Sequence, residues 1–399
     1  MKIALVYDFL SEFGGIERVM KTQAEYLRPE HELTLYFAYV EKDIKEHPFF
    51  QGKDIQEYSW WLWHRLSSKV MWSFLNPLPF AHKKFDFAIS HSFIGSWNCL
   101  KNKWVRKTPY AAFLHHPPQF LYFPNKETKI AYADSMKRKI AAWCGTVAGT
   151  PLRWLDKLVV KKADLVFANS EFTKRNIERI YERKDVIISY PPVRDIFKII
   201  NKKKAQEVRI KYSLQKPYVY AHSRIIPDKH FDWILEAMQY VNKKYDLVIS
   251  GSGEERYSES LKTYAKKIGL DTRVHFLGKI SDEDLVALHN EAEVFVLAAP
   301  KEEFGIVSVE AMACGTPCVA WNDQAGPQEL IGEGKTGFLA KPYDKKDLAE
   351  KIEQVISKNL KKERKKIAES VEKFSEENQK KIFIRALQKI TLSHHPLQE

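Results

Sequence analysis

The sequence predicts an α/β protein of two domains of similar size, each built on a parallel sheet. At 399 residues the chain is too long for one ordinary hydrophobic core. Short apolar segments typical of buried strands alternate with amphipathic helical segments. This alternation runs up to about residue 190 and starts again after it, so each half predicts a sheet of its own.

The domain limits follow from the composition. We expect residues 1–192 to form the first domain, residues 193–375 the second, and residues 376–399 a helix that packs back on the first. Pro191 and Pro192, followed by the basic and polar stretch 198–211, predict the linker. The final helix has an apolar face suited to packing, made of Ile382, Phe383, Leu387 and Ile390.

The bulk composition, with 44% hydrophobic residues, is that of a globular protein. No run of about eighteen apolar residues could span a bilayer, and the first apolar run reads as a strand and not as a signal peptide. The four cysteines, Cys99, Cys144, Cys314 and Cys318, are too scattered for a disulfide frame. We therefore expect a reducing, cytoplasmic location.

The net charge of +13 is concentrated in the first half. Residues 1–190 carry 29 Lys and Arg against 20 Asp and Glu, whereas the rest carries 35 against 31. The first half is therefore expected to meet an anionic partner.

A glycine pair follows the first predicted strand, residues 1–7. Gly14 and Gly15 precede a helix, and the amides at a helix N-terminus form a ready anion site. A second such turn, with Gly251 and Gly253, follows the strand 245–250. Neither turn has the three glycines of the dinucleotide fingerprint, so NAD is not indicated.

A tryptophan-rich stretch, residues 58–85, contains no acidic residue. Such a stretch suits a core helix, a single-stranded nucleic-acid surface or a membrane interface. Adjacent tryptophans of a helix cannot all face one core, and no nucleic-acid module accompanies them. The pattern therefore favours docking on an anionic membrane, with residues 137–162 as a second candidate. The membrane or acceptor residues would be Trp60, Trp61, Trp63, Arg65, Lys69 and Trp72.

Polar residues follow predicted strands in both halves. His115 and His116 stand at a strand end before two prolines, where ligands bind in open α/β sheets, although a turn histidine is the alternative. In the second half, the loop after strand 218–222 carries Ser223, Arg224 and Lys229 at a helix start, a natural place for a diphosphate.

The pair Asp282 and Asp284 has the form of a metal motif. We interpret both as acids at a helix start capped by Ser281, and we expect no metal.

The stretch EEFGIVSVEAMACGTPCV, residues 302–319, predicts a loop, a helix, a glycine cap and a strand. If most of the interval between Glu302 and Glu310 is helical, the two carboxylates lie roughly 10 Å apart with free helix amides between them. A ligand with hydroxyls at both ends and an anion between them, such as a nucleotide sugar, has that shape.

The order of these motifs resembles the family 4 glycosyltransferases of the GT-B fold. GGIERV, SRIIPDK, GSGEE, FLGKIS, EEFGIVSVEAMACGTPCVA and GPQELI occur in the family's order over nearly the whole chain. The stretches FLNPLPFAHKKFDFAISHSF, HHPP and VIISYPPV are similar to WbaZ-type mannosyltransferases. The resemblance implies two Rossmann-like domains that face each other across a cleft.

The resemblance also implies roles for individual residues. Glu302 would approach the donor sugar, Glu310 would bind the ribose, and Arg224 and Lys229 would neutralise the diphosphate. His115, or His116 by one register, would reach the sugar near its reacting carbon. Where the WbaZ-like pattern has arginine four residues after that histidine, this chain has Gln119. Further donor-binding positions would be Gly14, Gly15, Ser223, Gly251, Gly253, Lys279, Phe304, Gly305 and Ile306.

The function implied is retaining transfer of a hexose, most favourably mannose from GDP-mannose, to a lipid-linked or polysaccharide acceptor at the cytoplasmic membrane face. The nucleotide sugar would be the donor, with no further cofactor, no metal and no nucleic-acid partner. Two alternatives keep the fold without this reaction: a non-catalytic, membrane-associated binding subunit and a sugar-nucleotide epimerase.

Overall fold

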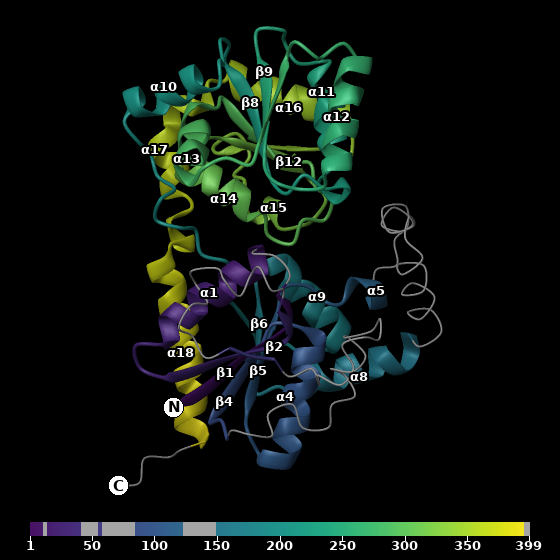
Figure 1. Ribbon diagram of the computed structural model, residues 1–399, viewed down its shortest axis with the longest axis vertical. Coiled ribbons are helices and arrows are strands. Elements are labelled where there is room, and N and C mark those ends of the chain that lie inside the picture. The colour runs from purple at the N-terminus through teal and green to yellow at the C-terminus, as the bar shows by residue number, and fades with distance from the viewer. Residues whose placement is uncertain (11–13, 41–54, 58–83, 123–148, 395–399) are drawn as a thin grey trace. The chain divides into compact units, whose positions relative to one another are not determined.

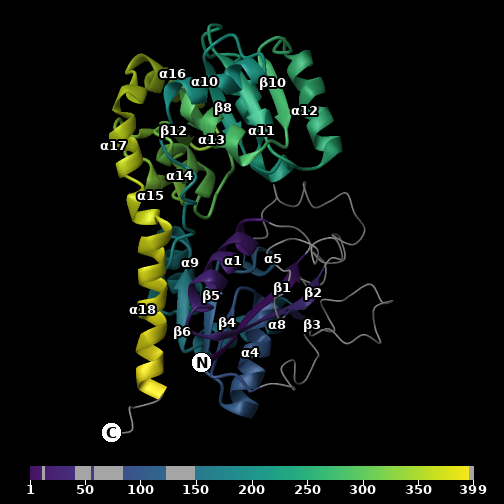
Figure 2. The same ribbon diagram turned by 60° about the vertical axis from the view of Figure 1, so that its left-hand side comes forward.

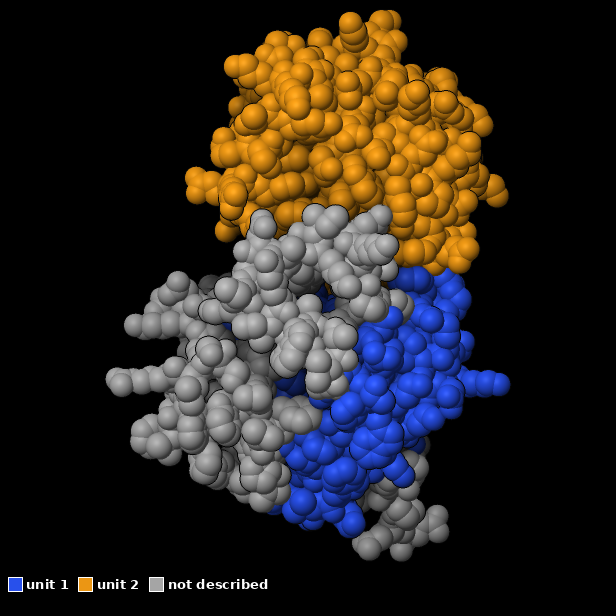
Figure 3. Space-filling model, turned by 90° about the vertical axis from the view of Figure 1, so that its right-hand side faces the viewer, with its two compact units in different colours: residues 1–190, 380–399 blue, residues 191–379 orange. Residues whose placement is uncertain are grey.

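The computed structural model describes residues 1–10, 14–40, 55–57, 84–122 and 149–394. The chain forms two compact units, which Figure 3 colours separately. Unit 1 comprises residues 1–190 and 380–399, and unit 2 comprises residues 191–379. Each unit contains a parallel sheet flanked by helices (Figure 1), which confirms the predicted fold class.

The sheet of unit 1 has the strand order β3-β2-β1-β4-β5-β6-β7 in the described part of the chain. Strand β1 (Lys2–Leu10), which extends past the expected end at Asp8, pairs in parallel with β2 (Glu32–Val40) and β4 (Phe87–Ser90). Successive strands are added on opposite sides of β1, so the switch point lies between β1 and β4, where open α/β sheets bind ligands. The other strands are β3 (Ile55–Glu57), β5 (Tyr110–Leu114), β6 (Leu165–Ala168) and β7 (Val186–Ile188).

Helices cover both faces of this sheet because alternate residues of its strands are buried on opposite sides. Ile3 and Leu5 of β1 pack with helices α1 (Gly15–Leu27) and α18 (Glu376–His394). Ala4 and Val6 pack on the opposite side with three helices, α4 (Phe93–Arg106), α8 (Gly149–Lys162) and α9 (Glu171–Tyr181). The short helix α5 (Gln119–Tyr122) follows β5.

Helix α18 begins in unit 2 and belongs to unit 1 from Lys380 onward. In Figures 1 and 2 its later turns lie alongside the sheet of unit 1. Phe383 is 1% exposed, and its ring lies 5.5 Å from that of Phe167 and 6.5 Å from that of Tyr26. The predicted return of the C-terminal helix to the first half is therefore observed.

The sheet of unit 2 has the order β10-β9-β8-β11-β12-β13 among the described residues. Its switch point lies between β8 (Tyr218–His222) and β11 (Val294–Val296), which pair in parallel. The remaining strands are β9 (Asp246–Ser250), β10 (Val274–Gly278), β12 (Cys318–Trp321) and β13 (Gly337–Ala340).

Three helices of unit 2 pack on one face of its sheet, around Val219 and Leu247. They are α11 (Phe231–Met238), α12 (Glu255–Lys267) and α16 (Lys345–Ser357). The other helices are α10 (Lys202–Lys211), α13 (Asp282–Glu291), α14 (Ile306–Ala313), α15 (Pro327–Leu330) and α17 (Arg364–Glu369), with 3₁₀ turns at Pro227–Lys229, Leu360–Glu363 and Glu372–Phe374.

The expectation that residues 198–211 form a linker is wrong for most of that stretch. Residues 202–211 form α10, which packs on α13 within unit 2. The helix is strongly basic, but Ala205 and Val208 are buried at 2% and 3% exposure. Ala205 and Val208 therefore give the helix a small buried face, and Arg209 and Lys211 add ion pairs to Glu291 and Asp284 of α13.

Candidate functional site

The loop and helix after β11 match the predicted order of loop, helix, glycine and strand. Helix α14 starts at Ile306, directly after Gly305, whose φ of 86° lies in the left-handed region that glycine adopts without strain. Gly315, with φ of 78°, ends the helix before β12. Glu302 lies in the loop, while Ile306–Glu310 are helical, so the helix covers five of the nine residues from Glu302 to Glu310 and the separation of the two carboxylates stays a prediction.

A second segment holds this loop in place. The backbone amide of Gly326 donates to the carbonyl of Glu302 at 2.8 Å, and the amide of Lys301 donates to Asp323 Oδ2 at 2.7 Å. A Cβ on Gly326 would lie 2.4 Å from the carbonyl oxygen of Glu303, so only glycine allows this approach. Asp323 and Gly326, which the sequence-based site did not include, thus position Glu302. The motif GPQELI, which begins at Gly326, was the available signal for that glycine, whereas Asp323 precedes the motif.

Lys229 and Glu302 form a partly buried ion pair. Nζ of Lys229 lies 2.6 Å from Oε2 of Glu302, with side-chain exposures of 19% and 17%. Burial by itself lowers the pKa of Lys229, but the charge of Glu302 and its hydrogen bond outweigh burial, so the pKa is raised. Lys229 is therefore a firmly charged cation beside a carboxylate.

Arg224 adds a second cation to the same loop. It is exposed, follows β8 by two residues, and its positive charge acts to lower the pKa of Lys229. The neighbouring Ser223 donates its backbone amide to the carbonyl of Ser250 at 3.4 Å. Unit 2 thus brings Arg224, Lys229 and Glu302 together at the switch point of its sheet.

Gly251 and Gly253 allow two loops to touch. A Cβ on Gly251 would lie 1.8 Å from the carbonyl oxygen of Ser223, and one on Gly253 would lie 2.1 Å from that of Ile225. The two glycines therefore let the loop after β9 support the loop that carries Arg224. Exposed Lys279 follows β10 at the same edge of the sheet. A direct donor contact of these three residues stays a prediction.

The remaining predicted donor residues of unit 2 lie in α14 or directly before it. Glu310 is 4% exposed, and its charge adds to burial in raising the pKa of Tyr220 on β8. Phe304 is 3% exposed and packs edge to face on Phe374 at 5.3 Å. The carboxylate of Glu310 therefore lies buried close enough to β8 for its charge to act on Tyr220.

In unit 1, the glycine pair opens α1 as predicted, at the carboxyl end of β1. The amide of Gly14 donates to Oε2 of Glu17 at 3.0 Å, so a carboxylate of the protein already occupies part of the expected anion site. A Cβ on Gly15 would meet nothing within 4 Å among the described residues, which leaves space beside the second amide.

The two candidate histidines differ in their surroundings. His115 is 7% exposed, and its Nε2 lies 3.1 Å from Nδ1 of His91. His116 is exposed, and its Nδ1 lies 3.0 Å from the carbonyl of Pro117. His91, which follows the buried strand FAIS, was missed at the sequence level. The signal was a histidine at the end of a strand adjacent to that of His115.

Several predictions fall on residues that the structure does not describe. Trp60, Trp61, Trp63, Arg65, Lys69 and Trp72 lie outside the described residues, and so does the side chain of Gln119. The helix cap predicted at Ser281 is confirmed, since Ser281 Oγ accepts from the amide of Asp284.

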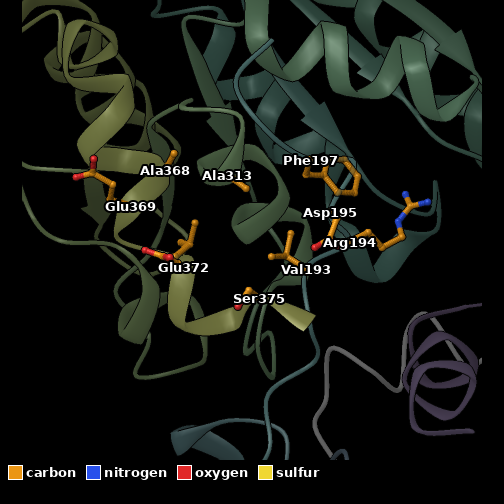
Figure 4. A pocket seen from close by; sticks show the side chains of 10 residues that line it. Val193, Arg194, Asp195, Phe197, Ala313, Ala368, Glu369, Glu372 and Ser375 are labelled. Atoms are coloured by element: carbon orange, nitrogen blue, oxygen red, sulfur yellow. The ribbon is translucent and has the colours of Figure 1, made fainter. Parts of the chain in front are cut away.

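A separate hollow of about 320 Å³ lies within unit 2, where residues 191–197 and 368–375 run beside the end of α14. In Figure 4 the side chain of Arg194 points away from the other labelled side chains. Arg194 forms an ion pair with Asp282 at 2.5 Å. None of the predicted site residues lines it. Its lining is Val193, Arg194, Asp195, Phe197, Ala313, Ala368, Glu369, Val371, Glu372 and Ser375.

Neither a membrane-spanning helix nor a metal-binding cluster is present among the described residues. No helix in the described part combines the length and apolarity needed to cross a bilayer. Within the same residues, no group of three or more His, Cys, Asp or Glu side chains is arranged to hold a metal ion.

Family models match both halves of the chain. The model described as Glycosyltransferase Family 4 matches residues 13–195, and that described as Glycosyl transferases group 1 matches residues 202–374. The two parallel sheets match those of GT-B proteins. The chain belongs to family 4 of the glycosyltransferases.

Individual relatives are more distant. Mannosylfructose-phosphate synthase of Agrobacterium fabrum is 30% identical over 152 residues, covering 36% of this chain and 33% of that protein. The serotype-specific mannosyltransferase WbdA of Escherichia coli is 26% identical over 214 residues, covering 51% and 26%. The matched region thus spans about a third or less of these relatives. Among solved structures, Anabaena HepE in complex with UDP superposes with a TM-score of 0.76 at 20% identity, covering 98% of this chain and 100% of that one.

Proposed function

We propose that the protein is a retaining hexosyltransferase, with mannose from GDP-mannose as the favoured donor. The observation that carries the proposal is the Lys229–Glu302 pair beside Arg224 at the switch point of unit 2. Two cations next to a carboxylate suit a ligand with a diphosphate joined to a sugar: the cations meet the phosphates, and the carboxylate accepts from sugar hydroxyls.

The charges of Arg224, Lys229 and Glu302 indicate how the transfer reaction proceeds. In the reaction, the bond between the anomeric carbon and the diphosphate oxygen breaks, and the acceptor oxygen bonds to that carbon on the same face. The acceptor proton passes to the departing phosphate. Arg224 and Lys229 stabilise the negative charge that develops on the leaving group, which removes the need for a metal in this role. Glu302 positions the sugar and forms no covalent bond to it. From unit 1, His115 contributes a polar contact to a substrate hydroxyl.

The names of two relatives support mannose as the transferred sugar, since one is a mannosylfructose-phosphate synthase and the other a mannosyltransferase. The structural neighbour from Anabaena was solved with UDP, which makes uridine the chief competing base. The donor proposal therefore needs a comparison of bases as well as of sugars.

We place the acceptor, a lipid-linked or polysaccharide saccharide, at an anionic membrane surface on the cytoplasmic side. Helices α4 and α8 pack together in unit 1 and expose Trp104, Val105 and Trp154 at 49%, 61% and 66%. The acidic residue of these two helices, Asp156, is buried, whereas Arg106 and Lys107 follow Trp104. Exposed indoles among cations suit the headgroup region of a membrane.

Incubation with labelled GDP, UDP and ADP sugars and a bacterial lipid extract tests the enzymatic proposal. We expect transfer from GDP-mannose to a lipid-extractable product. Transfer from a UDP sugar alone would contradict GDP-mannose as the donor. Donor conversion without an acceptor would indicate the epimerase, and neither transfer nor hydrolysis with any donor would indicate the binding subunit.

Vesicle co-sedimentation tests the membrane proposal. We expect binding that requires anionic lipid and weakens in a Trp104→Ala/Trp154→Ala variant and in a Trp60→Ala/Trp61→Ala/Trp63→Ala variant. The control is Tyr240→Ala, which removes a side chain that is 56% exposed in unit 2. Equal binding to neutral vesicles, or no effect of either tryptophan variant, would contradict the proposal.

A further inference from the structure

Two buried histidines lie at the carboxyl ends of neighbouring strands in unit 1. His91 follows β4 and His115 follows β5, and these strands pair in parallel with Ile89 opposite Ala111. Nδ1 of His91 and Nε2 of His115 are 3.1 Å apart, which is hydrogen-bond distance. His91 also stands at the switch point of the sheet, between β1 and β4.

An aromatic stack holds both rings in place. The ring of Phe113 lies 5.0 Å from that of His91 and 5.0 Å from that of His115, and it packs on Phe167 at 5.6 Å. Phe113 and His115 project from the same side of β5 because they are two residues apart. With exposures of 4% and 7%, the two imidazoles have little freedom to turn.

Both rings are neutral. Burial lowers the pKa of His91 to about 3. Burial also lowers the pKa of His115 well below its ordinary value, and the charges of His91 and His116 lower it further. A neutral imidazole carries one N–H and one acceptor nitrogen. Of the two facing nitrogens, one must therefore donate and the other accept.

The other ring nitrogen of His91, Nε2, decides which of the two facing nitrogens donates the hydrogen bond. Nε2 of His91 is buried and has no hydrogen-bond partner among the described residues. If its proton sat there, a buried N–H would be left without an acceptor, which is rarer and costlier than an unused lone pair. The proton of His91 is therefore on Nδ1, from which it is donated to Nε2 of His115.

We propose that His91 is a positioning residue that fixes His115 as the tautomer protonated at Nδ1. This proposal rests on the proposed role of His115 in glycosyl transfer. With Nε2 engaged as an acceptor, His115 presents an N–H at Nδ1, and this nitrogen, unlike Nε2 of His91, is not among the buried atoms that lack a partner in the described residues. His115 then donates a hydrogen bond to a substrate oxygen and does not act as the base that removes the acceptor proton.

NMR of the full protein labelled with ¹⁵N-histidine tests the tautomer directly. We expect Nδ1 of His115 to resonate in the protonated range and Nε2 in the unprotonated range, with assignment through His115→Gln. In His91→Phe, which keeps the ring packing on Phe113 but removes the donor, His115 loses this preference. In His91→Asn, the amide nitrogen can donate near the former position of Nδ1, so the tautomer is retained.

Kinetics provide the second measurement. We expect His91→Phe to lower kcat by roughly 10- to 100-fold, by analogy with the loss of a partner that orients a metal-ligating histidine, with little change in the donor KM. His91→Asn should recover most of the rate. His289→Phe serves as the control, because His289 is equally buried in unit 2 and both its ring nitrogens lack partners among the described residues.

The outcomes separate this proposal from the proposed function. Protonation of His115 at Nε2 in the unmodified protein would contradict the proposed Nδ1 tautomer. An unchanged kcat in His91→Phe would contradict the proposed positioning role of His91. If no donor supports transfer, the proposed function fails, while the spectrum still decides the tautomer. A His91→Phe protein that does not fold leaves the unmodified protein and His91→Asn to decide.

Discussion

Nζ of Lys229 lies 2.6 Å from Oε2 of Glu302, which joins the loop after β8 to the loop before α14. The two residues are 73 positions apart in the chain and meet because β8 and β11 are neighbours in the sheet. The pair therefore links the two loops at the switch point of unit 2 and holds a cation beside a carboxylate.

The first prediction concerns the coupling energy of this pair. A double-mutant cycle with Lys229→Ala and Glu302→Ala should give a coupling of about 1–3 kcal/mol in the free energy of unfolding, because both side chains are largely shielded from water. Urea denaturation of the four proteins measures it.

The matched control is the ion pair of Lys262 and Glu259, which has a similar separation of 2.8 Å but exposures of 49% and 62%. Its cycle should give no more than about 0.5 kcal/mol because solvent screens the pair. Equal coupling in both cycles would show that the burial of the Lys229 pair has no energetic role.

The second prediction concerns catalysis. Replacing Arg224 or Lys229 by alanine should lower kcat/KM for the donor by more than about 30-fold, equivalent to ~2 kcal/mol of transition-state stabilisation. Lys262→Ala, which removes an exposed lysine of the same unit, should leave kcat/KM unchanged. Near-normal rates for both active-site variants would exclude them from leaving-group stabilisation.

The third prediction separates a packing glycine from a ligand-binding one. Gly253→Ala should destabilise the protein by about 1–3 kcal/mol, because the new Cβ would lie 2.1 Å from the carbonyl oxygen of Ile225. Gly15→Ala should not destabilise it, since a Cβ there meets nothing within 4 Å among the described residues, but should weaken donor use if the amides of α1 bind an anion. Thermal unfolding and donor titration measure the two effects.

The fourth prediction concerns α18. Phe383→Ala should cost about 3–5 kcal/mol, because this 1% exposed ring contacts Phe167 and Tyr26 in the core of unit 1. The adjacent Ile382→Ala is the control, since Ile382 is 38% exposed. Similar losses for both variants in denaturant titrations would contradict the packing of this face.

The fifth prediction is a pH dependence. Burial raises the pKa of Asp156 to about 6, although hydrogen bonds from Tyr181 and Tyr122 oppose the rise. Because the folded-state pKa lies above the ordinary 3.8, the stabilising contribution of Asp156 is complete below that value and is lost as pH rises through about 6. Asp156→Asn does not titrate.

The variant should therefore gain stability relative to the unmodified protein between about pH 4 and about pH 8, by up to ~3 kcal/mol. Urea denaturation at both ends of this range measures the difference. A difference that does not change with pH would show that the pKa of Asp156 is not raised in the folded protein.

Much of unit 2 could be predicted because its signals are local. The strand over 218–222, the cap by Ser281, and the left-handed glycines around α14 each depend on residues within a few positions. The grouping of Arg224 with Lys229 was predictable for the same reason, since both lie on one loop.

Other features depended on contacts between distant residues. Residues 202–211 form a helix because Ala205 and Val208 are buried against α13, which their basic composition did not indicate. Gly14 was predicted as an anion site, yet its amide is partly satisfied by Glu17.

The sequence by itself determined the fold class, the family motifs and the residues that line the edge of each sheet, because periodicity, caps and glycine turns are read within short stretches. Only the tertiary structure decided which of those residues meet. The pairing of His91 with His115 requires the parallel register of β4 and β5, and that of Lys229 with Glu302 requires β8 beside β11. Sheet order and register arise from long-range packing, which no local pattern encodes.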